Sequence, residues 1–202
     1  GFSHSLTETT LKESGLYTKF VMRPTDYFTV IVGGRLGRYE IQSGDGVDKD
    51  SRSDTKFTGY GGVVLDLNEQ NSLYASYSAL YRPQESLGVD NKLLKPRHGS
   101  QVELGYKGAF FYDALNVRLS LYRMRDENAA ASIPANNAQF AALGKRVMQG
   151  AEFEVSGQIT DKWRIHAGYS YLDSDIEVGS TTRDDGIFFL MPRHTFNLWS
   201  TH

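Results

Sequence analysis

The sequence lacks several features that would assign it to a common class of protein. It contains no cysteine in 202 residues, so disulfide frameworks and thiolate metal sites are excluded. It contains no run of 18 apolar residues, which excludes a membrane-spanning helix. Its 22 lysines and arginines nearly balance 24 aspartates and glutamates, and no basic cluster is long enough to follow a phosphate backbone. We therefore expect no nucleic-acid partner.

Alternation of apolar and polar residues is the main pattern that the sequence does contain. In residues 72–81, one strand face would carry leucine, alanine and tyrosine, and the other would carry serine. The same pattern returns at residues 102–107, 115–121 and 163–171. The polar faces also carry charges in mid-strand, at Glu103, Arg118, Glu152, Glu154 and Arg164. Soluble sandwiches show alternation too, but these charges, together with aromatic residues at the strand ends, favour a membrane barrel with a wet lumen.

The lengths of the connections alternate as well. We predict nine strands, at residues 15–23, 27–41, 55–66, 72–82, 99–108, 114–125, 146–157, 163–173 and 193–201. Short connections rich in turn-forming residues occur at 24–26, 68–71, 109–113 and 159–162, and long polar ones at 42–54, 83–98, 126–145 and 174–191. An antiparallel up-and-down barrel inserted from one side produces this alternation, because only every second connection faces outward and is free to grow. A β-propeller is not supported, since no Gly-His or Trp-Asp signature recurs.

No constellation of residues points to catalysis or to a metal site. The five histidines are far apart, and none has a partner at the helical spacing that would present two imidazoles to one ion. Glu152 and Glu154 share a strand face, but in a wet lumen such a pair is more often a hydrated wall than an acid/base site. We expect neither an enzyme nor a bound cofactor or metal.

Six segments, taken in order, resemble the C-terminal barrel of TonB-dependent siderophore receptors. Within that family the chain resembles the receptors for ferric pyoverdine and coprogen. The segments are residues 29–35, 74–77, 94–96 with 102–108, 150–157, 167–172 and 192–194. The chain departs from the family at Arg97-His98, where an acidic residue usually follows the proline of the Leu-Lys-Pro segment.

The resemblance implies a fold, a function and partners. The fold is an all-β, antiparallel up-and-down transmembrane barrel of 22 strands, of which residues 1–202 would supply about nine. We expect the plug domain and the final strands to lie outside this chain. The function would be uptake of a ferric siderophore, the transported ligand, across the bacterial outer membrane. The partners would be outer-membrane lipid and the TonB-ExbB-ExbD complex, which acts through the plug.

The resemblance also implies a ligand site at the outward end of the barrel. Aromatic and basic side chains would hold a bulky and often anionic chelate on the loops and upper lumen walls. The candidate ligand-binding residues are Tyr81, Arg82, Tyr122, Arg125, Phe140 and Arg146.

Two other functions remain open from the residues alone. A passive outer-membrane porin would share the alternating strands and the unequal loops, but it usually has fewer strands and a constriction lined by opposed charges. A soluble carbohydrate-binding β-sandwich would share the aromatic residues, but its apolar side chains would be buried against a second sheet.

Overall fold

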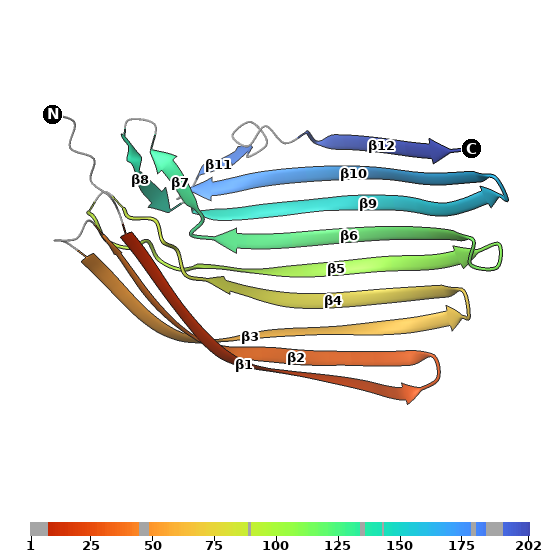
Figure 1. Ribbon diagram of the computed structural model, residues 1–202, viewed down its shortest axis with the longest axis horizontal. Coiled ribbons are helices and arrows are strands. Elements are labelled where there is room, and N and C mark those ends of the chain that lie inside the picture. Colours follow the sequence, from red (N-terminus) through yellow and green to blue (C-terminus); the bar gives the residue numbers. More distant parts are fainter. Residues whose placement is uncertain are drawn as a thin grey trace.

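The computed structural model is one antiparallel sheet of long strands, curved and open at its edges (Figure 1). It describes residues 8–44, 49–88, 90–133, 136–142, 144–178, 181–184 and 192–202. The long strands pair side by side in chain order. Helices able to cross a bilayer are absent from the described residues.

Nine long strands build the sheet, and the nine strands that the sequence predicts are confirmed. They are β1 (Glu8–Thr25), β2 (Phe28–Gly44), β3 (Lys49–Asn68), β4 (Asn71–Arg82), β5 (Arg97–Phe110), β6 (Leu115–Glu127), β9 (Lys145–Thr160), β10 (Trp163–Val178) and β12 (His194–Thr201). The short strands are β7 (Ala130–Ile133), β8 (Asn136–Ala142) and β11 (Thr181–Asp184). Strands β1 to β6 pair in this order, followed by β9 and β10, and β10 also pairs with β11 and β12. β7 and β8 form a separate hairpin in the loop between β6 and β9.

Three of the predicted long loops contain more strand than expected. The predicted loop at 42–54 is mostly the continuation of β2 and β3, whose backbones stay paired as far as Gly44 and Lys49. The predicted loops at 126–145 and 174–191 contain the β7–β8 hairpin and β11. The polar composition of these segments misled the prediction, because a strand surrounded by water needs backbone pairing but no apolar face.

The register of the sheet separates two chemically different faces. Leu104 pairs with Ala75 and Leu121, and residues paired in this way point to the same side. We call the side that carries Leu104 and Leu121 the outer face. Arg118 pairs with Lys107 and Glu154, and the side that carries them is the inner face.

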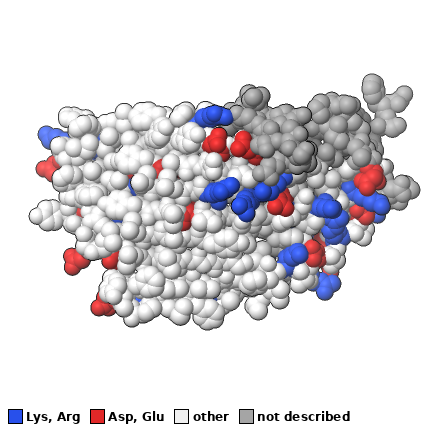
Figure 2. Space-filling view, turned by 180° about the vertical axis from the view of Figure 1, so that it is seen from behind, with Lys and Arg blue, Asp and Glu red and all other residues white. Residues whose placement is uncertain are grey.

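The five charged residues predicted for the polar face all lie on the inner face. The ladder that places them there runs through β5, β6, β9 and β10. Figure 2 shows the outer face, where a broad uncharged zone separates a charged margin at the short turns from a second one toward the long loops. An uncharged zone between two polar margins is the surface that a bilayer requires.

No second layer of described residues covers the apolar face of the sheet. Among the described residues, the buried apolar side chains are Tyr39, Ile41, Leu93 and Ala129, all near the long loops. Leu104 and Leu121 of the outer face are 55% and 53% exposed. A sandwich would bury these leucines against another sheet, so the soluble sandwich is not supported.

The strands are longer than a bilayer requires, and the excess lies at the loop end. A tilted strand crosses the hydrocarbon core with about 9–11 residues, whereas β3 has 20. β3 pairs with β4 only from Asn68 up to Tyr60, and beyond Tyr60 it pairs only with β2. The upper parts of β1, β2 and β3 therefore bend away from β4 (Figure 1).

We predict that Leu121→Arg in the full-length protein lowers the free energy of unfolding from lipid vesicles by about 2–4 kcal/mol, because the charge would lie in hydrocarbon. Ser76→Arg is the control, since Ser76 is exposed on the inner face and pairs with Glu103. We expect it to change stability by less than about 1 kcal/mol. Denaturant titration of both variants in vesicles measures the difference, and equal destabilisation would mean that the faces are wrongly assigned.

Candidate ligand-binding site

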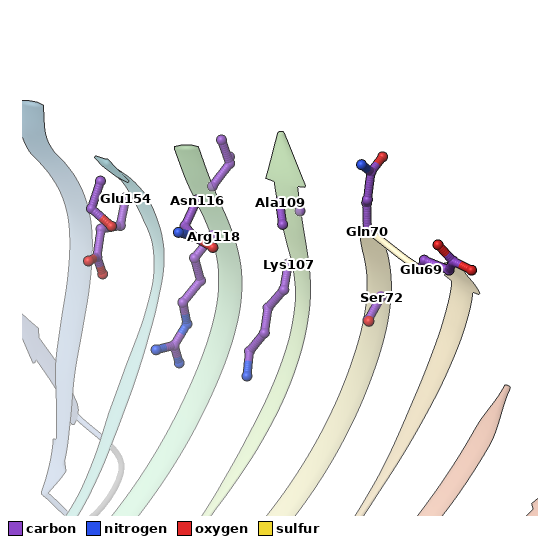
Figure 3. Close-up of a pocket in the computed structure, with 11 residues that line it drawn as sticks. Glu69, Gln70, Ser72, Lys107, Ala109, Asn116, Arg118 and Glu154 are labelled. Carbon is purple, nitrogen blue, oxygen red and sulfur yellow. The ribbon is translucent and has the colours of Figure 1, made fainter. Parts of the chain in front are cut away.

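The inner face carries two groups of polar side chains, one near the short turns and one near the long loops. The group near the turns borders a hollow of about 320 Å³. Arg118 and Lys107 reach in the same direction there from neighbouring strands, and Glu154 lies on the strand beyond Arg118 (Figure 3). Both signs of charge are present, so this hollow selects for neither anions nor cations.

A tyrosine connects this lower group to the middle of the wall. The Tyr74 hydroxyl donates to Glu103 over 2.6 Å, and the Lys107 ammonium lies 5.2 Å from the centre of the tyrosine ring. A Cβ atom at Gly105 would come within 2.2 Å of that ring, so glycine is required for Tyr74 to lie flat along the sheet. The contacts of Tyr74 with Glu103 and Lys107 therefore fix this part of the inner face.

The group near the long loops is centred on a buried carboxylate. Asp126 is 1% exposed and accepts two hydrogen bonds of 2.6 Å from Arg97, through Nε and Nη2. It also accepts one of 2.8 Å from Nη2 of Arg146, whose side chain is only 11% exposed. One carboxylate therefore fixes two guanidinium groups from the strands on either side of β6.

A third arginine completes what we call the arginine pocket, defined by Arg82, Arg97 and Arg146. These residues border a hollow of about 360 Å³ whose wall also includes Glu85 and Ala130. Arg82 is exposed, and within the described part of the chain it forms no hydrogen bond or ion pair. Its guanidinium group is therefore available to a ligand, unlike the two that Asp126 holds.

The loop between β4 and β5 lies beside the pocket, and hydrogen bonds tie it to itself, to the residues that follow β6 and to β3. The Gln84 side chain donates to the carbonyl oxygens of Lys95 and Asn128, each over 2.6 Å, and accepts from the amide of Ala130 over 2.9 Å. Farther along the loop, Arg52 of β3 donates to the carbonyl of Leu94 over 2.6 Å. These bonds fix the rim of the pocket before any ligand arrives.

The structure brings together two of the six residues predicted for the site. Arg82 and Arg146 both line the arginine pocket. Tyr81 is next to Arg82 in the chain, but its ring lies 5.4 Å from that of Tyr39, and its hydroxyl donates to Asp54. Tyr81 therefore fastens β4 to the bent part of β2 and β3, where the strands themselves no longer pair.

The other three predicted residues lie elsewhere. Tyr122 is on the inner face four positions nearer the turns than Asp126, where it pairs with Glu103 and Gly150. Arg125 is on the outer face, because it alternates with Asp126 along β6. The backbone of Phe140 pairs with Ser132 in the β7–β8 hairpin, and its side chain lies outside the described residues.

Arg97 and Asp126 belong to the site but were not predicted from the sequence. Asp126 fell within a predicted loop, where an acidic residue is expected to be hydrated. If the alternation along residues 116–124 had been extended to residue 126, Asp126 would have been predicted to lie on the inner face. Arg97 was noted as a departure from the family pattern, and the structure shows that it binds the buried carboxylate.

The comparisons with known proteins agree with this architecture. The family model described as "TonB dependent receptor-like, beta-barrel" matches residues 3–202. The ferripyoverdine receptor of Pseudomonas aeruginosa is 34% identical over 170 residues, covering 79% of this chain and 20% of that receptor. A ferric-pyoverdine receptor, PbuA, of another Pseudomonas is 30% identical over 206 residues, covering 95% of this chain and 25% of that receptor. The chain spans about a quarter of the length of these relatives.

Solved structures show the same fold. The crystal structure of the Pseudomonas aeruginosa ferripyoverdine receptor bound to ferripyoverdine superposes with a TM-score of 0.77 at 26% identity, covering 95% of this chain and 26% of that one. The alcaligin outer-membrane receptor FauA of Bordetella pertussis gives a TM-score of 0.76 at 25% identity, covering 96% and 34%. The chain therefore belongs to the β-barrel family of TonB-dependent receptors, which are proteins of the bacterial outer membrane.

Proposed function

We propose that the full-length protein takes up a ferric siderophore across the outer membrane and that the arginine pocket helps to bind it. The observation that supports this proposal is the position of Arg82, Arg97 and Arg146 on the inner face next to the long loops. A ligand arriving from outside would meet this part of the wall first. The names of the matched receptors, which include those for pyoverdine, point to the same class of ligand.

The three arginines would contribute in two ways. Arg97 and Arg146 are held by Asp126, so their guanidinium groups do not have to be ordered when the ligand binds. Arg82 has no partner among the described residues, so it can form a two-pronged bond to a carboxylate or another planar anion on the ligand. No covalent step is needed, because the iron would stay with the oxygen ligands of the siderophore.

The remaining proposed contacts extend the site along the inner face. Tyr122 could contact the apolar part of a chelate that reaches deeper into the lumen. Tyr81 would act indirectly, by holding the bent strands beside the pocket, and Phe140 would approach from the β7–β8 hairpin. Arg125 is omitted from the proposed site, because a residue on the outer face cannot reach a ligand in the lumen.

Energy for transport would come from the TonB-ExbB-ExbD complex acting on a plug domain. We propose that residues 1–202 are one part of a 22-stranded barrel and that the rest of the protein supplies the other strands and the plug. The hollow near the short turns, with its mixed charges, would then face the lower part of the plug. A passive porin is the less favoured alternative, because the matched relatives are receptors.

We predict that Arg82→Ala weakens binding of the ferric siderophore by about 10- to 100-fold, which corresponds to the loss of one charged hydrogen bond of about 1.5–3 kcal/mol. Arg82→Lys should recover part of the loss. Arg125→Ala is the matched control on the same part of the wall, and its affinity should be unchanged. The measurement is fluorescence quenching of the full-length receptor by a siderophore selected from ferric pyoverdine, hydroxamate and catecholate chelates. Binding of none of them by the unaltered receptor would contradict the proposed function, and equal affinity in Arg82→Ala would contradict the proposed site.

We also predict that Asp126→Asn lowers the free energy of unfolding by about 3 kcal/mol, because two guanidinium groups would lose their buried counter-charge. Asp173→Asn is the control, since the Asp173 side chain is 26% exposed and lies 3.8 Å from Arg193. It should cost less than about 1 kcal/mol. Denaturant titration of both variants in vesicles gives the comparison, and equal costs would show that Asp126 does not hold the pocket together.

A further inference from the structure

Two arginines of β6 face away from the lumen at the loop end of the sheet. Arg123 and Arg125 alternate along the strand with Tyr122, Met124 and Asp126, so both lie on the outer face. Both are exposed, and neither forms a hydrogen bond or ion pair with another described residue. They have no role in the arginine pocket, from which the sheet itself separates them.

The two arginines directly follow the apolar zone of the outer face. Leu119 and Leu121 precede them on the same side of β6, and Val102 pairs with Arg123 from the neighbouring strand. Val102 is 50% exposed. Because two residues of a strand advance about 7 Å, Arg123 and Arg125 lie roughly 7 and 14 Å beyond Leu121. The space-filling view shows charged side chains meeting the edge of the uncharged zone at this end (Figure 2).

Most carboxylates of the same face already have other partners. Glu127 lies 3.1 Å from His98. Asp173 lies 3.8 Å from Arg193 and accepts a hydrogen bond from Gln149. Asp175 is two strands away from Arg125, with Val147 between them, and among the described contacts it forms no ion pair with either arginine. The charge of the two arginines is therefore not neutralised within the described sheet.

We propose that Arg123 and Arg125 bind the phosphate of a lipid in the outer leaflet of the membrane. Leucine and valine side chains place acyl chains against this part of the sheet, so the group that meets the arginines must belong to a lipid headgroup. Guanidinium groups bind phosphate through two parallel hydrogen bonds. A siderophore is excluded as the occupant, because this surface faces the bilayer and not the lumen.

The test uses the detergent-solubilised full-length receptor and a phosphorylated glycolipid, lipid A with both phosphates, as the probe. Dephosphorylated lipid A has the same acyl chains and tests for acyl contacts alone. Native mass spectrometry measures the affinity of each. We expect the receptor to bind the phosphorylated form more tightly and Arg123→Ala with Arg125→Ala to weaken that binding by roughly 30-fold, at about fivefold for each arginine near a charged lipid surface.

Two further variants make the result specific. Lysine at both positions should retain most of the binding, because lysine keeps the charge. Arg38→Ala is the control for loss of an outer-face arginine, since Arg38 lies 2.9 Å from Glu40 and is already paired. The proposal would be overturned if the double alanine variant bound phosphorylated lipid A as tightly as the unaltered receptor does. It would also be overturned if the unaltered receptor bound the phosphorylated and dephosphorylated forms equally. Siderophore affinity is measured separately, so failure of the lipid site and failure of the proposed uptake are distinguishable.

Discussion

The structure depends on the requirement that backbone amides and carbonyls be paired wherever water is absent. A closed sheet meets this requirement inside a bilayer, and its strands can then carry different side chains on their two faces. In this chain, the backbone ladder is continuous from β1 to β12, whereas buried apolar side chains are few among the described residues. The stability of the sheet therefore depends on its surroundings more than on an internal core.

The same alternation that divides lipid from lumen also sorts the arginines near the long loops. Arg82, Arg97 and Arg146 belong to the inner face, and Arg123 and Arg125 to the outer face. Neighbouring positions on β6 thus carry different roles: Asp126 organises the pocket, and Arg125 would contact the membrane. A shift of one residue in register would exchange these roles, so the ladder that holds the sheet together also determines the chemistry of each side.

The sequence was sufficient to predict the nine long strands and the two faces, because alternation reports directly on which side each residue takes. It was not sufficient for the pocket. Arg97 and Arg146 are 49 residues apart. They meet because Arg146 pairs with Asp126 on one side of β6, while Gly99 pairs with it on the other side and the side chain of nearby Arg97 reaches the carboxylate. Predicting this meeting required knowledge of the strand register. The position of Arg125 could have been derived from its spacing to Leu121, but its place beside a long loop suggested a ligand contact. The strands beyond the membrane were missed because their polar composition resembles that of loops.

The most direct test of the account is to measure what surrounds each face in a bilayer. Single cysteines can be placed at Leu104 and Leu121 on the outer face and at Ser76 and Arg118 on the inner face. This segment contains no other cysteine that would interfere. Spin labels at these positions of the full-length protein report collision with oxygen, which concentrates in lipid, and with a water-soluble nickel complex. We predict that the two leucine positions respond to oxygen and the other two to nickel. Nickel access at Leu104 and Leu121 would contradict the membrane assignment.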